Sequence, residues 1–141
     1  MDRLRSARER IATATDLPGI LDAAYDAFED MLAVLRLHQE DDESAFPAYV
    51  VAAAAAANGR DWIAGADTLP SAKSRDHADD LPEGTSVTDI AQVVAALSSE
   101  LSAQLAATAA RVADPGDRVC CQGAATEAAA IAVLLSGANP P

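Results

Sequence analysis

The stretch SAFPAYVVAAAAAANG, residues 44–59, decides the fold class of this chain. From Ala45 to Ala57 every side chain is apolar except for the hydroxyl of Tyr49. A helix that is apolar on every side has to be buried. These thirteen residues would extend only about 20 Å as a helix, which is too short to cross a bilayer. We therefore expect a central helix surrounded by others.

The flanks of this stretch carry the usual signals of helix ends. Ser44 is suited to the N-cap, and Pro47 fits within the first turn, where its missing N–H costs nothing. Asn58–Gly59 is a frequent C-terminal stop, because Asn and Gly tolerate the left-handed conformation that ends many helices. The sequence therefore predicts that this helix ends before residue 60.

The rest of the chain shares the alanine-rich character of residues 44–59. Of its 141 residues, 35 are alanine, whereas Phe, Tyr and Trp together supply five. Alanine is the best helix former, and its small side chain lets neighbouring helices approach closely. We predict an all-α protein with a single domain over residues 1–141. It would be an antiparallel helical bundle of four long helices plus a short N-terminal helix, with Ala-rich close packing.

Apolar periodicity indicates where the other helices lie. The clearest pattern covers residues 17–41, with Asp16 placed to cap it and its acidic residues expected mainly on the solvent side. Further helices are predicted over residues 2–15, over 87–113, and from after Asp117 to Gly137. The turn DPGD, residues 114–117, makes the last two helices antiparallel neighbours.

Residues 60–86 have the weakest pattern. Residues 60–67 fit one helical turn that would let Trp62 cover an end of the bundle. Residues 68–86 are polar and contain two Leu-Pro breaks, so they are predicted as a long loop. This loop is long enough to connect helices at opposite ends of the bundle.

The net charge of −12 excludes several classes of partner. Nucleic-acid backbones and anionic membranes would repel such a chain, so we expect neither as a partner. The first ten residues are the exception, with four arginines against Asp2 and Glu9. This basic helix could pack on its own acidic domain, pack on a second copy, or stay solvated. The charged N-terminal segment lacks the apolar run of a signal peptide, so we expect a cytoplasmic protein.

Cys120 and Cys121 are the only cysteines in the chain and stand side by side. With Asp117 as N-cap they would fall in the first turn of a helix, where the helix dipole can lower a thiol pKa. Neighbouring helical residues point about 100° apart, so an intrachain disulfide would distort the backbone. The preferred interpretation is small buried side chains, and the alternative is a thiol redox sensor that uses Cys120 or Cys121.

Four other side chains are candidates for ligand binding: His38, Tyr49, Trp62 and His77. Their pocket would lie at the bundle end under the loop of residues 68–86. The plainer interpretation makes His38 a cation at a helix C-terminus, His77 a solvated loop residue, and the two aromatic residues packing groups. No Glu-x-x-His pair, CxxC pair, phosphate-binding glycine loop or nucleophile elbow occurs in the sequence. We therefore predict no metal, no cofactor and no catalytic residue.

Three functions follow from these features. Helices that are apolar on every side need more cover than one copy of the chain supplies. This favours a non-enzymatic protein that acts through protein contacts, as a homodimer or with another protein. An acidic surface would prefer a basic partner, and that contact would weaken with salt. The alternative is a small-molecule-binding protein or enzyme with the pocket just described. The third is the thiol redox sensor.

Overall fold

The computed structural model describes residues 2–69 and 87–137, and these residues form α-helices with no β-strand among them. This confirms the predicted all-α bundle, with one short N-terminal helix and four long ones. The helices are α1 (Asp2–Thr13), α2 (Leu17–His38), α3 (Phe46–Ala64), α4 (Val87–Arg111) and α5 (Pro115–Gly137).

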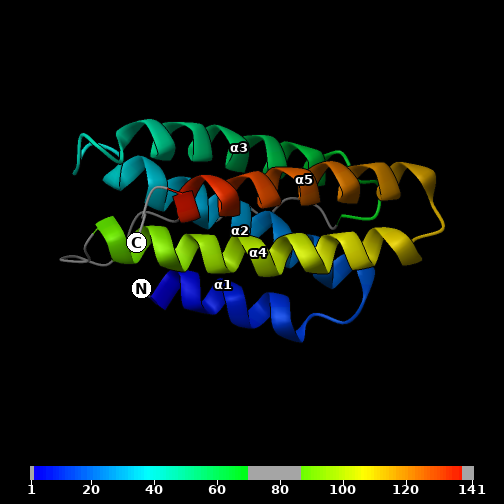
Figure 1. Cartoon of the computed structure of the whole chain (residues 1–141). Helices are drawn as coiled ribbons and strands as arrows, with labels where there is room; N and C mark the ends of the chain where they lie inside the picture. The colour runs from blue at the N-terminus through cyan, green and yellow to red at the C-terminus, as the bar shows by residue number, and fades with distance from the viewer. Residues whose placement is uncertain (1, 70–86, 138–141) are drawn as a thin grey trace.

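The four long helices form a ring in which each packs on two neighbours (Figure 1). α5 lies between α3 and α4, and α2 lies opposite α5, between the same two helices. α1 packs on α2 and α4 and covers the groove between them. α4 and α5 share the most extensive packing, as expected for antiparallel neighbours joined by a tight turn.

The order of the helices gives the bundle one long crossover. α2 and α3 meet at one end, and α4 and α5 meet at the other; we call these the α2–α3 end and the α4–α5 end (Figure 1). α3 finishes at the α4–α5 end, whereas α4 begins at the α2–α3 end. Residues 65–86 therefore link opposite ends, as their length suggested, and of these only residues 65–69 are described.

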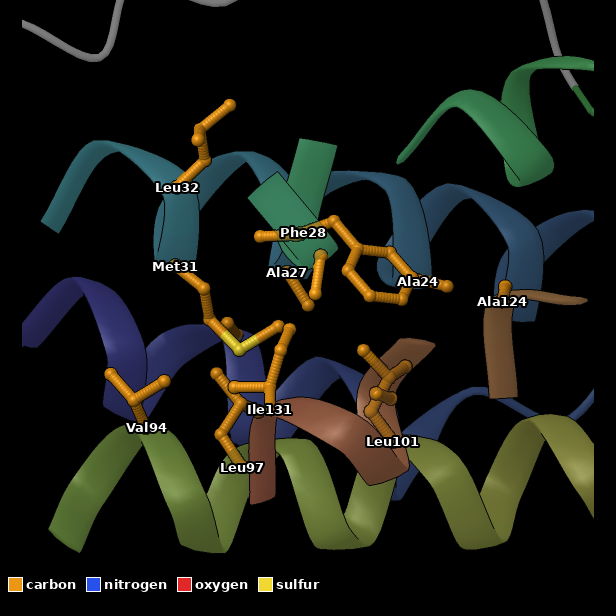
Figure 2. Packing of buried hydrophobic residues seen from close by; sticks show 14 of the residues in the cluster. Ala24, Ala27, Phe28, Met31, Leu32, Val94, Leu97, Leu101, Ala124 and Ile131 are labelled. Atoms are coloured by element: carbon orange, nitrogen blue, oxygen red, sulfur yellow. The ribbon is translucent and has the colours of Figure 1, made fainter. Parts of the chain in front are cut away.

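The core lies inside this ring and is filled by one stripe from each helix. Phe28 and Met31 of α2 point toward Leu97 and Leu101 of α4, with Ile131 of α5 beside them (Figure 2). All five side chains are at most 1% exposed. Between these large residues, alanines of α3 and α5 are fully buried, so the backbones approach closely. The predicted Ala-rich packing is therefore present in the described residues.

α1 is held by apolar contacts and by ion pairs to its own domain. Leu4, Ala7 and Ile11 are buried against the bundle. Arg3 Nε lies 2.7 Å from Asp30 Oδ1, and both side chains are at least 95% buried. The basic N-terminal helix therefore packs on the acidic surface of its own chain. The expectation that the acidic residues of α2 lie mainly on the solvent side was wrong for Asp26 and Asp30, which are 6% and 2% exposed, because α1 covers that side of α2.

The start of α2 follows the prediction, whereas the ends of α3 differ from it. Asp16 caps α2 by accepting a hydrogen bond from the N–H of Gly19, at 2.9 Å. Ser44 does not cap α3: Ala45 stands at the N-cap without a side-chain bond, and Ser44 donates to Asp42 instead. α3 also continues past Asn58–Gly59 to Ala64, so Trp62 belongs to this helix and not to a separate turn.

α3 is not the central helix that its composition suggested. Its buried side packs on α2 and α5, but it does not contact α4. Phe46 and Val50 are each 39% exposed, and Val51 is 52% exposed. The bundle has no central position, because its four long helices surround a core of side chains. The apolar outer side of α3 is therefore left uncovered by the described residues.

Candidate functional site

The two cysteines lie further along α5 than predicted. α5 begins at Pro115, and Asp114 caps it by accepting a hydrogen bond from the N–H of Asp117, at 2.9 Å. Cys121 is buried and Cys120 is half-buried, and neither forms a disulfide. The predicted cap at Asp117 was wrong by one turn, so the thiols are beyond the reach of the helix N-terminus.

The surroundings of both thiols disfavour the thiolate. Burial, and then the negative charge of Asp117, raise the pKa of Cys121 to about 11. Burial also raises the pKa of Cys120, and the carboxylates of Asp117, Asp67 and Asp114 add to this effect. The expected lowering of a thiol pKa is therefore reversed. A redox role for these thiols stays a prediction that the local chemistry does not support.

His38 and Tyr49 lie at the α2–α3 end. His38 Nδ1 is 2.7 Å from Asp41 Oδ2, while its Nε2 is buried and has no hydrogen-bond partner in the part of the chain described. Tyr49 is fully buried, and its burial together with the nearby charge of Asp41 raises its pKa to about 12. Tyr49 is therefore part of the bundle core, and the side chain of His38 is 11% exposed beside Asp41.

Trp62 lies at the opposite end of α3. The helical rise puts about 20 Å between it and Tyr49. Its ring covers Gly123 of α5 so closely that a Cβ there would be 2.4 Å from Cδ2 of the indole, and Trp62 is still 40% exposed. The structure therefore does not bring Trp62 together with His38 and Tyr49. His77 and most of the predicted loop lie outside the described residues.

The feature that stands out instead is a surface without charge, formed by the outer sides of α3, α5 and α4. Asn58, Asp61 and Trp62 of α3 share a depression with Glu127 of α5, so this side of α3 faces α5. Val51 and Ala54 extend the same helical side. We call this surface the charge-poor face. It comprises Val51 and Ala54 of α3, Ala129, Ala130 and Val133 of α5, and Ala96, Ser99 and Ala103 of α4.

A groove between α4 and α5 runs along the charge-poor face. It has a volume of about 610 Å³ and no charged residue in its lining. Val133 stands at its edge and is 72% exposed, which is the highest value among the large apolar side chains described. The groove is lined by Gln92, Ala95, Ala96, Ser99, Ala132, Val133, Leu135 and Ser136.

Charged side chains are turned away from most of this face. Between Val119 and Ser136, Glu127 is the only charged residue of α5. In α4, Glu100 is the only one between Ile90 and Ala110, and its carboxylate accepts hydrogen bonds from Arg8 on α1. The sequence predicted that uniformly apolar helices would need cover from a second protein surface, but it did not indicate which residues of α3, α4 and α5 would face outward.

α4 and α5 are also the two described helices that are long and apolar enough to cross a membrane. The segments are Asp89–Arg111 and Pro115–Ser136, and 39% of the most apolar window of each is buried. Core helices of water-soluble proteins meet the same criterion, so it does not decide between a protein and a lipid partner. Among the described residues, no group of three His, Cys, Asp or Glu side chains is arranged to hold a metal ion.

No family model matches the chain, and no curated protein or solved structure matches it. The arrangement of its own residues is therefore the basis for assigning a function.

Proposed function

We propose that this chain is a non-enzymatic helical-bundle protein that works through protein contacts, and that its partner is a second copy docked on the charge-poor face. The observation that carries this proposal is Val133, 72% exposed beside a groove without charge. A large apolar side chain in that position gains by leaving water.

The overall charge favours this face for contact between copies. Two chains with a net charge of −12 repel each other, so they associate best where neither presents carboxylates. On α5, Glu127 is the charged residue beside the face, and it lies toward the α4–α5 end, about 9 Å from Val133 along the helix. Two copies can therefore meet around Val133 without bringing like charges together.

The shape of the face favours a two-fold pair. A symmetric dimer uses the same surface on both copies, so a projecting group and its recess must lie on one face. Val133 projects and the α4–α5 groove is the recess, and both belong to the charge-poor face. In such a dimer, Val133 of each copy would enter the groove of the other.

The face is small for a dimer contact. Its residues span about 10 Å along α4, from Ala96 to Ala103, and about 20 Å across the three helices at the usual spacing. A standard interface takes about 800 Å² from each partner, so the dimer contact would extend beyond these eight residues along the α4–α5 groove. The small side chains allow close packing, which compensates in part for the modest area.

A charge placed on the face tests the proposal. We expect the wild-type chain to sediment as a dimer at micromolar concentration. Val133→Glu should sediment as a monomer, because a dimer of this variant would bury two like charges at the contact. The matched control is Leu37→Glu on α2, which is 52% exposed but lies away from the face. Leu37→Glu should leave the dimer intact, and circular dichroism should show both variants folded.

Three results would contradict the proposal. The wild type could be monomeric at high concentration, or Val133→Glu could stay dimeric. The wild type could also bind lipid vesicles as a monomer and lose that binding on Val133→Glu. This last result would make the face a membrane contact and not a contact between copies.

A further inference from the structure

A cavity of about 430 Å³ opens at the α4–α5 end, apart from the charge-poor face. Four separate parts of the chain meet there: the turn before α2 with its first residues, the segment after α3, the last turn of α4, and the α4–α5 turn with the start of α5. It is lined by Thr15, Leu17, Ile20, Thr68, Thr108, Arg111, Val112, Ala113, Asp114 and Asp117. No sequence pattern pointed to this cavity, because its residues come from distant positions.

One part of the lining is apolar and well ordered by the core. Ile20 is 4% exposed and Val112 is 9% exposed, and Leu17 packs against the same core cluster. Three branched side chains from two elements thus form an apolar wall. A cavity near the lower limit of common ligand sites suits a small molecule with a short branched or aromatic side chain.

The other part of the lining carries opposite charges that do not neutralise each other. Arg111 has no hydrogen-bond or ion-pair partner among residues 2–69 and 87–137. Asp114 uses Oδ2 to cap α5. Asp117 is 2% exposed and accepts two hydrogen bonds from Thr68. One comes from the backbone N–H of Thr68, at 3.3 Å, and the other comes from the Thr68 hydroxyl.

We propose that this cavity binds a small zwitterion with an apolar side chain, of the chemical class of the apolar α-amino acids. The Arg111 guanidinium receives the ligand carboxylate, because its planar donors match two carboxylate oxygens. The carboxylates of Asp114 and Asp117 receive the ammonium group. Leu17, Ile20 and Val112 receive the side chain.

The mixed charge of the lining selects against simpler ligands. A plain carboxylate would be held by Arg111 but repelled by Asp114 and Asp117. A plain amine would be held by Asp114 and Asp117 but repelled by Arg111. A ligand that carries both charges satisfies both groups, and an apolar side chain fills the rest of the cavity. This site does not depend on the proposed dimer, since it shares no residue with the charge-poor face.

Three probes with one carbon skeleton separate these contributions. They are L-leucine, 4-methylpentanoate, which lacks the amine, and L-leucinamide, which lacks the carboxylate. Each is titrated into the full chain at slightly acidic pH, where the amines are protonated, and followed by amide NMR shifts. We expect L-leucine to bind in the millimolar range or tighter, and each single-charge probe to bind about tenfold more weakly. The shifts should centre on Thr15, Thr68 and Arg111.

Two substitutions at exposed residues test the roles of the positive and the negative charge. Arg111→Gln should weaken the binding of L-leucine about tenfold, so that L-leucine binds no more tightly than L-leucinamide. Asp114→Asn should weaken the binding of L-leucine and L-leucinamide, which carry an ammonium group, but not the binding of 4-methylpentanoate. Asn removes the charge and still caps the helix. Arg36→Gln, an exposed arginine in the last turn of α2, is the matched control and should change nothing.

Three outcomes would overturn the proposal. The first is the absence of shifts at the cavity with all three probes. The second is equal affinity for the three probes, and the third is an affinity for L-leucine that Arg111→Gln leaves unchanged. Either of the last two would mean that the charges do not recognise the ligand.

Discussion

Gly59 of α3 lies directly against the ring of Phe28 on α2. A Cβ at this position would lie 2.3 Å from Cε1 of Phe28, whose ring is fully buried. The ring therefore occupies the space that any other side chain would need. Gly59 serves packing inside α3, and this explains why the helix continues through a pair of residues that usually ends one.

We expect Gly59→Ala to destabilise the protein by about 1–2 kcal/mol. Alanine gains about 1 kcal/mol of helix propensity over glycine, but overpacking a well-filled core costs about 1–3 kcal/mol or more. The clash is severe and Phe28 is fully buried, so the packing cost should exceed the gain. Urea unfolding followed by circular dichroism measures the difference.

Gly123→Ala is the matched control, because it adds the same methyl group to another helical glycine. Its Cβ would meet the indole of Trp62, at 2.4 Å, but that ring is 40% exposed and can turn toward solvent. We expect a smaller effect, near zero. Equal destabilisation by both variants would show that rigid backbone contacts, and not the burial of Phe28, set the cost.

Residue-level signals in the sequence were accurate where they act locally and failed where packing decides. Asp16 caps α2 as predicted, because the cap bond involves only the next three residues. Asn58–Gly59 was misread as a stop, since its role depends on Phe28, which is distant in sequence. Cys120 and Cys121 were placed too near the start of α5, because Asp114 and Asp117 are both plausible caps and only the turn geometry distinguishes them.

At the scale of elements, α1 is the helix whose attachment depends most on charge. The buried Arg3–Asp30 pair is the innermost contact, and Arg10 Nη1 lies 2.6 Å from Asp26 Oδ2 beside it. Arg8 and Glu100 form a third pair, which is exposed on both sides. The sequence left open whether this helix packs on its own chain, because charge balance alone does not give a partner or a register.

The buried and exposed pairs should differ sharply in their contribution to stability. Asp30→Asn removes the carboxylate charge that lies 2.7 Å from the buried guanidinium of Arg3, so we expect a loss of about 3 kcal/mol or more. Glu100→Gln removes an exposed pair and should cost less than about 1 kcal/mol. Urea unfolding gives both values, and hydrogen exchange of α1 amides shows whether the helix detaches. Similar small losses in the two variants would mean that the apolar contacts of α1 are sufficient.

The helix pattern predicted the bundle but not its surface. The apolar period of residues 17–41 predicted one core side for α2, and Phe28 and Met31 on that side are fully buried. Uniformly apolar segments such as residues 45–57 have no period, so they give no information about which side faces a neighbour. For that reason the sequence predicted an excess of apolar surface but did not identify the charge-poor face or the exposure of Val133.

At the scale of the whole molecule, the net charge and the uncharged face act in opposite directions on assembly. The charge of −12 repels a second copy at long range, while the charge-poor face attracts it at contact. A basic protein partner would behave differently, since its attraction is electrostatic. The two kinds of partner therefore respond to salt with opposite signs.

We expect added salt to strengthen the dimer. Raising the ionic strength from about 0.01 M to about 0.1 M shortens the Debye length from about 30 Å to about 10 Å, which screens repulsion between the two acidic copies. The dissociation constant measured by sedimentation should fall about threefold or more over this range. The ionic strength is kept at or below about 0.1 M so that salt has little effect on the apolar contact itself.

Glu127→Gln is the matched variant for this measurement, because Glu127 is the charged residue of α5 beside the charge-poor face, whereas the carboxylate of Glu100 is paired with Arg8. Without its charge, the dimer should be tighter at low salt and should respond less to added salt. Dissociation of the dimer by salt would contradict the contact between uncharged faces. It would indicate that the copies are held by ion pairs, in which case the basic α1 and the acidic residues of a second chain would be the surfaces to test next.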